Sequence, residues 1–393
     1  MKKAPSLITI IIASCIISIL ILTACGSKAA ADKNMTPLSQ IPQNISPSLT
    51  YESRDTLSYA QEFAIDRYSD GYTLITISDG SRFLIVPENS PAPTQLSDDI
   101  TVINQPLDNI YLVASAVMDI FRALDSIDSI RLSGTRSDDW YIDEARAAME
   151  SGDILYAGKY SEPDYELILS QGCRLAIENG MITHSPEVGE KLKTLGIPML
   201  IDRSSYEPHP LGRVEWIKLY GALLGKEELA QQLFDEQQSA LSRLTQTAAG
   251  KDAKTVAFFY ITANGAVNVR KSADYIPKLI ELAGGKYIFD NLGDKESSSF
   301  SMTMQMEEFY AAAKDADYLI YNSSIDGELS SIDTLLEKSP LLADFKAVQE
   351  GKVWCTTKNL YQESMSIGGM ITDVNAMLTQ DKAAQTKYMY LLE

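Results

Sequence analysis

Strand-like apolar runs alternate with helical segments over most of this 393-residue chain, and one long helical stretch divides the alternation in two. The strands are predicted at residues 110–116, 127–132, 174–178, 197–201, 255–261, 318–321 and 353–356. Segments of helical spacing lie between them. Strands and helices that alternate in this way build mainly parallel sheets covered on both faces. The sequence therefore predicts an α/β fold with two Rossmann-like lobes.

The dividing stretch, residues 212–250, holds almost no strand signal. Positions on one face recur at intervals of three and four residues, at Leu229, Leu233, Gln237, Leu241 and Leu244. This spacing is typical of an amphipathic helix, and we expect a single long rigid helix to join the lobes. The expected parts are an N-terminal lobe, the link and a C-terminal lobe, at residues 50–211, 212–250 and 251–393. Within the first part, residues 72–86 read as a β-hairpin that turns at Asp79-Gly80.

The N-terminus has the pattern of an export signal. Lys2 and Lys3 precede an apolar run at residues 7–22, and the run ends in Leu-Thr-Ala-Cys at Cys25. The ending resembles a bacterial lipobox, in which the Cys is lipidated after cleavage, so residues 1–24 are predicted to be a lipoprotein signal peptide. A retained transmembrane helix is the alternative, but the run is short for a span of about 20 residues. Residues 25–49, rich in Ser, Pro and Asn, suit a flexible tether. We expect an exported protein that is anchored by Cys25 at the outer face of the cytoplasmic membrane or in the cell envelope.

Charge and side-chain chemistry exclude several partners. The formal net charge is −19, so nucleic acid and docking on anionic lipid through a basic patch are not expected. Cys173 and Cys355 remain beyond the leader; we expect buried free thiols, with a disulfide as the alternative. The two histidines, His184 and His209, are too few for a zinc or manganese site, and no resident metal or cofactor is expected.

Four segments together resemble a known family. They are SEPDYELIL, KTLGIP, PLGRVEW and LAGGKYIF, at residues 161–169, 193–198, 210–216 and 282–289. In order and spacing they are similar to periplasmic-binding-protein receptors of the siderophore, haem and cobalamin class, from about residue 106 to the C-terminus. The resemblance implies a ligand cleft between two lobes, an ABC permease with its ATPase as partners, and a monomer. It also implies a metal chelate as ligand, with a ferric siderophore expected and haem or a corrinoid as alternatives.

Two lobe-tip carboxylates carry the docking role that the resemblance implies. Glu166 takes it in the N-terminal lobe, and Glu307 or Glu308 takes it in the C-terminal lobe, each pairing with permease arginines. The simpler alternative is that a carboxylate in the first turn of a helix stabilises that helix. Two departures from the family pattern bear on the ligand class: Cys173-Arg174 and Ala316-Asp317 stand where Pro-Asp is usual, and the hairpin is an elaboration.

Candidate ligand-binding residues come from the segments that follow strands, where open α/β sheets bind ligands. They are Arg136, Trp140, Tyr156, Lys159, Tyr160, Tyr260, Arg270, Lys271, Lys358 and Tyr361. Aromatic rings could stack on a flat chelate, and Arg or Lys could neutralise an anionic one. The alternative for each is a packing tyrosine or a solvated charge. Trp140, Tyr160 and Arg270 are the strongest candidates because they lie in polar, loop-like stretches.

Enzyme motifs are absent from the sequence. It has no Gly-x-Ser-x-Gly, no Walker loop, no His-Glu-x-x-His and no dinucleotide fingerprint. We therefore expect a protein that is not an enzyme. A lipid-anchored surface hydrolase that uses two distant carboxylates is one alternative. A sensory binding protein without a transporter is another, and it would differ by the loss of the lobe-tip glutamates.

Overall fold

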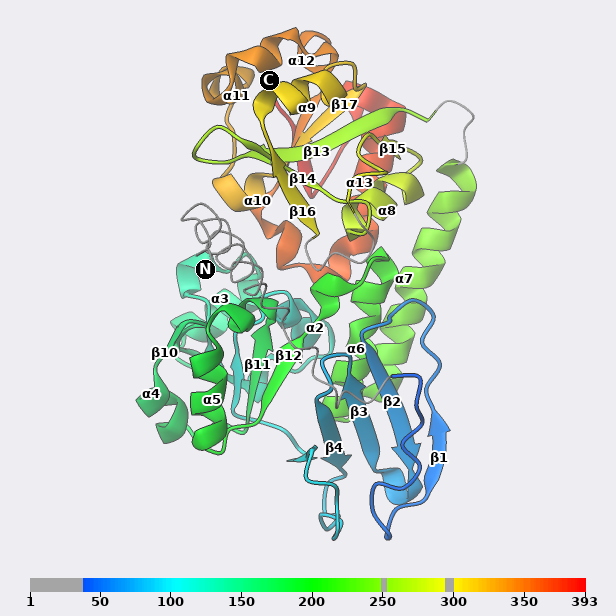
Figure 1. Cartoon of the computed structure of the whole chain (residues 1–393), viewed down its shortest axis with the longest axis vertical. Coiled ribbons are helices and arrows are strands. Elements are labelled where there is room, and N and C mark those ends of the chain that lie inside the picture. Colours follow the sequence, from blue (N-terminus) through cyan, green and yellow to red (C-terminus); the bar gives the residue numbers. More distant parts are fainter. Residues whose placement is uncertain (1–37, 249–252, 294–299) are drawn as a thin grey trace, which may run out of the picture. The chain divides into compact units, whose positions relative to one another are not determined.

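The computed structural model describes residues 38–248, 253–293 and 300–393 of the chain (Figure 1). The predicted signal peptide and Cys25 lie outside these residues. In the described part, no helix is long and apolar enough to cross a bilayer. Three main sheets are present. Two of them form the N-terminal and C-terminal lobes that the sequence predicts, and each lobe is an α/β unit. The third sheet precedes both lobes in sequence.

The N-terminal sheet has five strands in the order β1-β2-β3-β4-β5. They are β1 (Tyr51–Arg54), β2 (Phe63–Tyr68), β3 (Thr73–Ile77), β4 (Arg82–Val86) and β5 (Ile100–Asn104). The first four pair in an antiparallel fashion, and β5 runs parallel to β4. The predicted hairpin is β3 and β4, so this prediction is confirmed, but it belongs to a larger sheet. Alternating apolar side chains give the sheet two buried faces, one in the main core and one in a separate small core.

The small core corrects the tether prediction for residues 38–49. Ile45 and Leu49 are buried in it, against Tyr68 and other side chains of the sheet. The Tyr68 hydroxyl donates to the backbone oxygen of Pro42, and Arg54 donates to that of Gln40 at 2.9 Å. Ile45 and Leu49 are too far apart in a polar stretch to give a periodic signal. Both nevertheless cover the outer face of the sheet, which would otherwise be exposed to water.

The N-terminal lobe is a parallel sheet in the order β12-β11-β6-β7-β8. Its strands are β6 (Ile110–Leu112), β7 (Ile130–Ser133), β8 (Leu155–Tyr156), β11 (Leu175–Asn179) and β12 (Met199–Asp202). Its helices are α2 (Val117–Ala123), α3 (Asp143–Glu150), α4 (Tyr165–Ser170) and α5 (Pro186–Thr194). A short ribbon of β9 (Gly158–Lys159) and β10 (Glu162–Pro163) precedes α4. Strands buried on both faces explain the nearly continuous apolar runs of the sequence.

Two helices replace the single long helix that the sequence predicts as the link. They are α6 (Pro210–Leu224) and α7 (Glu227–Ala248). The chain turns between them at Gly225, which has φ +70°, a conformation that glycine adopts without strain. Helix α6 is buried on nearly all sides because the N-terminal sheet, α7 and elements of both lobes pack around it. In Figure 1, α7 runs beside α6 and past the N-terminal sheet.

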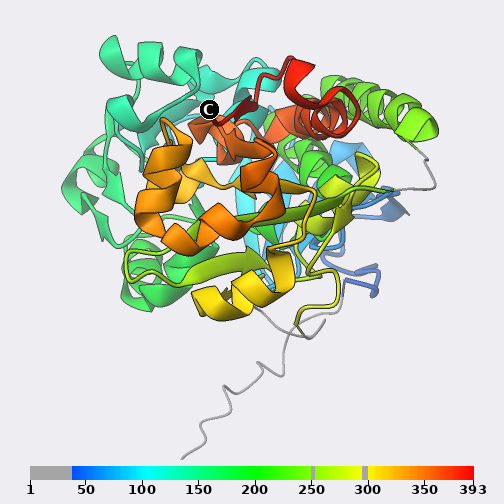
Figure 2. The same ribbon diagram turned by 90° about the horizontal axis from the view of Figure 1, so that it is seen from above.

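The C-terminal lobe has a mixed sheet in the order β16-β14-β13-β17-β18-β19, with β15 paired to β13. The strands are β13 (Thr255–Ile261), β14 (Val267–Arg270), β15 (Lys286–Tyr287), β16 (Ser301–Met304), β17 (Tyr318–Tyr321), β18 (Val353–Thr356) and β19 (Met389–Leu391). The helices are α8 (Tyr275–Leu282), α9 (Met306–Ala313), α10 (Ser323–Asp326), α11 (Ile332–Lys338), α12 (Lys346–Gln349) and α13 (Ile367–Gln380). Figure 2 shows the helices from yellow α9 to red α13 around these strands. The expected α/β class is confirmed.

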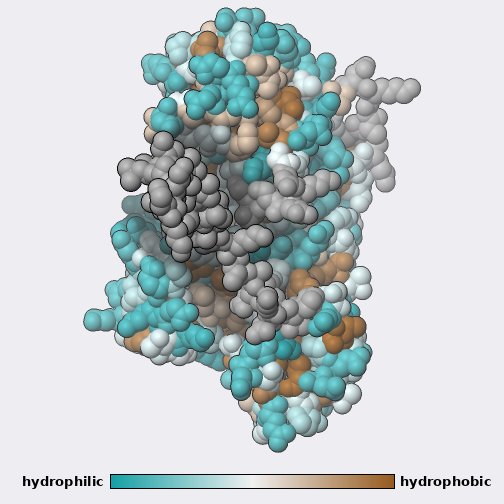
Figure 3. Space-filling model, in the orientation of Figure 1, coloured by the Kyte–Doolittle hydropathy of each residue, from teal (hydrophilic) through white to brown (hydrophobic). Residues whose placement is uncertain are grey.

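The surface and the thiols agree with an ordinary water-exposed body. On the face in Figure 3, hydrophilic residues dominate and the hydrophobic patches are small and separate. Cys173 is half-buried and Cys355 is buried, and both are free thiols, as expected. Burial raises the pKa of the Cys173 thiol to about 11 and that of Cys355 to about 12, which makes both unreactive at neutral pH.

Candidate functional site

The N-terminal lobe brings two predicted ligand-binding residues together at the carboxyl ends of neighbouring strands. Arg136 follows β7 and Tyr156 ends β8. The guanidinium carbon of Arg136 lies 4.3 Å from the centre of the Tyr156 ring, in a cation–π contact. Arg136 is exposed and Tyr156 is half-buried, so the pair presents both a positive charge and a ring edge to a ligand. This end of a parallel sheet is where ligands of open α/β folds bind.

Three further candidates of the N-terminal lobe have different environments. Trp140 is 0% exposed and packs in the main core, so it is a packing residue and cannot touch a ligand there. Its indole NH has no hydrogen-bond partner among the described residues. Tyr160 is half-buried against the small helices of the lobe, and Lys159 is exposed, 3.3 Å from Glu162. The prediction for Trp140 was wrong because the residues around it are polar in sequence while its side chain packs in the apolar core.

In the C-terminal lobe, Arg270 and Tyr361 belong to a buried polar network. An Nη of Arg270 donates to the Tyr361 hydroxyl, and its other Nη lies 3.7 Å from Asp274. The side-chain amide of Asn322 donates to the same hydroxyl at 2.9 Å. Burial raises the pKa of Tyr361, so its hydroxyl stays neutral. These groups satisfy one another's hydrogen bonds, and Arg270 and Tyr361 are both half-buried. Their part in ligand binding stays a prediction.

The remaining C-terminal candidates are less constrained. Tyr260 is half-buried and packs against the core. Lys358 lies 3.8 Å from Glu328. The Lys271 side chain passes close to Gly293, where a Cβ would lie 2.7 Å from the Lys271 Cδ.

Several contacts that sequence reasoning missed connect the lobes directly. The Gln362 side chain accepts from Tyr141 N at 2.8 Å and donates to Asp139 O at 2.7 Å. The Met365 amide donates to the buried carboxylate of Asp119 at 2.8 Å. Each pair joins residues more than 200 positions apart, so no local pattern could have revealed it.

An aromatic pair also spans the lobes. The rings of Tyr206 and Phe300 meet edge to face, with their centres 5.4 Å apart. Tyr206 follows β12 of the N-terminal lobe, and Phe300 precedes β16 of the C-terminal lobe. Both side chains are half-buried, so each keeps some ring surface accessible.

The lobe-tip carboxylates occupy matching positions. Glu166 and Glu307 are each the second residue of their helix, α4 and α9, and each stands two residues before a buried side chain, Ile168 or Phe309. Glu166, Glu307 and Glu308 are all exposed. In α4 the capping role belongs to Asp164, whose carboxylate accepts from Leu167 N at 3.0 Å. Helix capping therefore does not account for Glu166.

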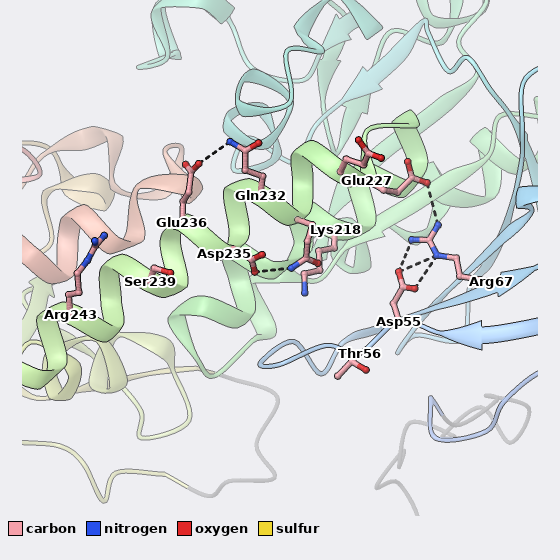
Figure 4. Close-up of a pocket in the computed structure, with 12 residues that line it drawn as sticks. Asp55, Thr56, Arg67, Lys218, Glu227, Gln232, Asp235, Glu236, Ser239 and Arg243 are labelled. Carbon is pink, nitrogen blue, oxygen red and sulfur yellow. Dashed lines mark hydrogen bonds and ion pairs between the residues drawn. The ribbon is translucent and has the colours of Figure 1, made fainter.

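A polar groove of about 960 Å³ lies apart from these contacts, between α7 and the end of β1 (Figure 4). It is lined by Asp55, Thr56, Arg67, Lys218, Glu227, Glu228, Gln231, Gln232, Asp235, Glu236, Ser239 and Arg243. Arg67 is paired with Asp55 at 2.6 Å and with Glu227 at 3.3 Å. Every lining residue is polar or charged by type.

The described residues offer no cluster of three His, Cys, Asp or Glu side chains that could hold a metal ion. His209 Nδ1 accepts the backbone NH of Leu211 at 3.1 Å, at the start of α6, and its ring stacks on Tyr59. Burial lowers the pKa of His209 to about 4. This histidine is therefore a neutral helix cap at physiological pH.

Comparison with known proteins gives three results. The model of a family described as periplasmic binding protein matches residues 115–360. Two uncharacterized lipoproteins of Methanocaldococcus jannaschii are similar to the chain, at 26% and 24% identity. The matches cover 88% and 92% of this chain and 86% and 93% of the relatives.

Among solved structures, a periplasmic haem-binding protein of Pseudomonas aeruginosa is similar with a TM-score of 0.57 and 15% identity, over 72% of this chain and 96% of its own. A periplasmic haem-binding protein of Vibrio cholerae has a TM-score of 0.55 and 18% identity, over 67% and 97%. An ABC-type Fe3+-hydroxamate transport protein of Saccharomonospora viridis has a TM-score of 0.53 and 19% identity, over 68% and 93%. At these identities the likeness shows the fold. The solved chains are covered almost fully while about three tenths of this chain is unmatched, so the chain carries additional structure.

Proposed function

This chain belongs to the periplasmic binding protein family, and from that premise we propose that it captures a metal chelate outside the cytoplasmic membrane and delivers it to an ABC importer. The family consists of binding proteins, so the chain is a binding protein and not an enzyme. The observation that carries the delivery step is the matched placement of Glu166 and Glu307, one exposed carboxylate at the same helical position in each lobe.

The proposed ligand is a ferric siderophore, with haem or a corrinoid as the second candidate. Of the similar structures, two are haem-binding proteins and one belongs to an Fe3+-hydroxamate transport system. The stacked Arg136 and Tyr156 support an anionic ligand that carries flat groups, because the guanidinium supplies charge and the ring supplies contact area. The ligand would lie between the lobes, where the strand ends of the N-terminal sheet face the C-terminal lobe.

The proposed docking pair is Glu166 and Glu307, and Glu308 is assigned no part in it. Glu308 is the third residue of its helix, and in α4 that place belongs to Leu167, which has no charge. Carboxylates on two lobes can engage two basic groups of one permease together. Complementary charge of this kind speeds encounter and fixes orientation. The permease with its ATPase would complete the importer.

The proposed anchor is the lipidated Cys25, at the outer face of the membrane. The M. jannaschii relatives are named as lipoproteins, and the leader pattern ends at this residue. A chain of about a dozen residues separates Cys25 from the packed residues that begin at Leu38.

The experiment that tests delivery is charge reversal of both lobe tips, Glu166→Lys with Glu307→Lys. Uptake of radiolabelled ferric siderophore should fall at least about tenfold in cells, while chelate affinity of the purified protein stays unchanged. The matched control is Glu308→Lys, which adds the same charge to the same helix and should leave uptake near normal. Normal uptake in the double variant would exclude the docking role and favour a binding protein that works without a transporter.

A further inference from the structure

The N-terminal sheet is joined tightly to the helical link. The segment between β1 and β2 points its backbone amides at two buried carboxylates near the start of α6. Glu215 accepts from the amides of Ser58, Tyr59 and Ala60 at 2.7–3.0 Å. Glu207 accepts from those of the next two residues, 61 and 62, at 2.9–3.0 Å. Five amides held by two carboxylates fix this segment, because charge-assisted hydrogen bonds are the stronger kind.

The last residue of the fixed segment, Glu62, reaches the end of β12. Its carboxylate accepts from Arg203 Nε at 2.7 Å. The guanidinium carbon of Arg203 in turn lies 4.1 Å from the centre of the Tyr206 ring. Two contacts therefore connect the N-terminal sheet, which lies outside the residues matched by the family, to the loop that follows β12.

Two further neighbours position Tyr206. Phe300 of the C-terminal lobe meets the ring edge to face at 5.4 Å. A Cβ on Gly180 would lie 2.7 Å from the Tyr206 hydroxyl oxygen, closer than real Cβ contacts, so a side chain there would push the ring away. The ring is thus positioned by Arg203 and by the absence of a side chain at Gly180, while the ring contact with Phe300 crosses between the lobes.

We propose that Tyr206 and Phe300 are an aromatic pair that contacts the ligand, and that Glu62 is a positioning residue which holds Tyr206 through Arg203. A ligand that enters between the lobes separates the Tyr206 and Phe300 rings and then packs against one of them. The ligand must then carry a planar conjugated group, as a catecholate or a tetrapyrrole does, because only such a group restores the lost ring contact. This inference rests on the proposed function and narrows its ligand to aromatic chelates.

The physical basis is the geometry of ring contacts. Aromatic pairs at centre distances of 4.5–7 Å are stabilised beyond the area they bury, by roughly two- to tenfold in an equilibrium constant. An aliphatic hydroxamate chelate would break the Tyr206–Phe300 contact and supply no ring in return. The pair therefore discriminates between chelate classes of similar size and charge.

The test measures the affinity of the mature chain in detergent for three chelates. These are hemin, the ferric complex of 2,3-dihydroxybenzoate, and the ferric complex of the aliphatic hydroxamate desferrioxamine. The variants are Tyr206→Ala, Tyr206→Phe and Glu62→Gln, with Tyr141→Ala as the control for removal of another partly exposed tyrosine. Titration followed by ligand absorbance gives each dissociation constant.

We expect one of the planar chelates to bind more tightly than the aliphatic one. Tyr206→Ala should weaken that binding about tenfold, which is the upper part of the range for an aromatic contact. Tyr206→Phe keeps the ring and should stay within about twofold. Glu62→Gln should reduce the preference for the planar chelate over the aliphatic one, a ratio that a general loss of stability would not change. Tyr141→Ala should leave all three affinities unaltered.

Two results would overturn the inference alone: tightest binding of the aliphatic chelate, or binding of a planar chelate that Tyr206→Ala leaves unchanged. The proposed function would survive either result, because a chelate is still bound. If the unaltered chain binds none of the three, the inference and the chelate-receptor function both fall.

Discussion

The two lobes contain the same short unit, and one position distinguishes them. In each, an asparagine stands at the end of a buried strand, as the last residue of β11 or the first after β17, and its side chain accepts the amide two residues later. Asn179 accepts from Met181 N at 2.9 Å, and Asn322 accepts from Ser324 N at 3.3 Å. The residue before the asparagine is Glu178 in the N-terminal lobe and Tyr321 in the C-terminal lobe. Both side chains are fully buried.

The difference shows how one plan tolerates two kinds of interior. The Tyr321 ring packs edge to face on Phe259, with centres 5.6 Å apart. Neither carboxylate oxygen of Glu178 has a hydrogen-bond partner in the part of the chain that the structure describes. Burial raises the pKa of Glu178 to about 8, so the group is mainly protonated at neutral pH. The N-terminal lobe thus carries a titratable group where the C-terminal lobe carries a ring.

The largest effect is expected from removal of the ring. Tyr321→Ala should lower the free energy of unfolding by about 3–5 kcal/mol, because it leaves a cavity beside Phe259 in a close-packed core. Denaturant titration followed by tryptophan fluorescence measures the loss. Tyr321→Phe, which keeps the ring, is the control and should cost less than half as much. A small loss in Tyr321→Ala would mean that the ring is not closely packed at this position.

The second effect should have the opposite sign and depend on pH. The pKa of Glu178 in the folded state, about 8, exceeds the ordinary value of 4.5, so the folded state holds a proton that the unfolded state has released between these pH values. The free energy of unfolding should therefore fall as pH rises from 4.5 to 8. Glu178→Gln keeps the shape, cannot ionise and should remove that part of the pH dependence.

At pH 9 the Gln variant should be more stable than the unaltered chain by on the order of 3 kcal/mol. Near pH 4 the two proteins should differ little, since the carboxyl group is then protonated in the folded state and largely so in the unfolded state. Thermal melts of both proteins across pH 4–9 give the comparison. Parallel stability curves would show that Glu178 is ionised and stabilised by a partner.

The third effect compares the two asparagines. Asn179→Ala removes one side-chain acceptor at the start of a helical turn and should cost about 1 kcal/mol. Asn322→Ala removes the same kind of acceptor and also the bond to the Tyr361 hydroxyl, so it should cost about 2 kcal/mol. Denaturant titrations of the two variants and of Asn322→Asp, which keeps the acceptor, give the difference. Equal losses of unfolding free energy in Asn179→Ala and Asn322→Ala would mean that the bond from Asn322 to the Tyr361 hydroxyl adds nothing to stability.

Local pattern was sufficient for the central strands but not for the edges. Residues 255–261, 318–321 and 353–356 were predicted as strands and are strands with the same bounds. They lie side by side in one sheet, where burial on both faces demands a continuous apolar run. The edge strands β1 and β19 were missed because short, partly exposed strands lack such a run.

The candidate site was less predictable because it depends on which loops meet. Arg136 and Tyr156 come from adjacent strands, and the rule that ligands bind at strand ends placed both correctly at one edge of the sheet. Trp140 and Arg270 lie in stretches that are equally polar in sequence, yet Trp140 is fully buried and Arg270 is half-buried beside Asp274. The contact between Tyr206 and Phe300 joins distant segments, and composition around either residue contains no trace of it.

The smallest effect concerns the lobe tips. Glu166 stands in a helix that Asp164 already caps, whereas Gln305, the residue before α9, makes no side-chain capping bond among the described residues. The Glu307 carboxylate therefore has more to contribute to the uncapped amides of its own helix. Glu307→Gln should cost about 0.5 kcal/mol of stability at low salt, and Glu166→Gln should cost less.

Glu308→Gln is the matched control, because Glu308 lies in the same first turn. This substitution should lower stability about as much as Glu307→Gln. Thermal melts at low and high salt measure all three variants, and salt should screen the differences away. Substitution of Glu307 and of Glu308 would then have equal effects on stability, whereas only substitution of Glu307 would affect uptake. A larger cost for Glu166→Gln would mean that this carboxylate supports its helix despite Asp164, and it would weaken the argument that docking is its reason to be there.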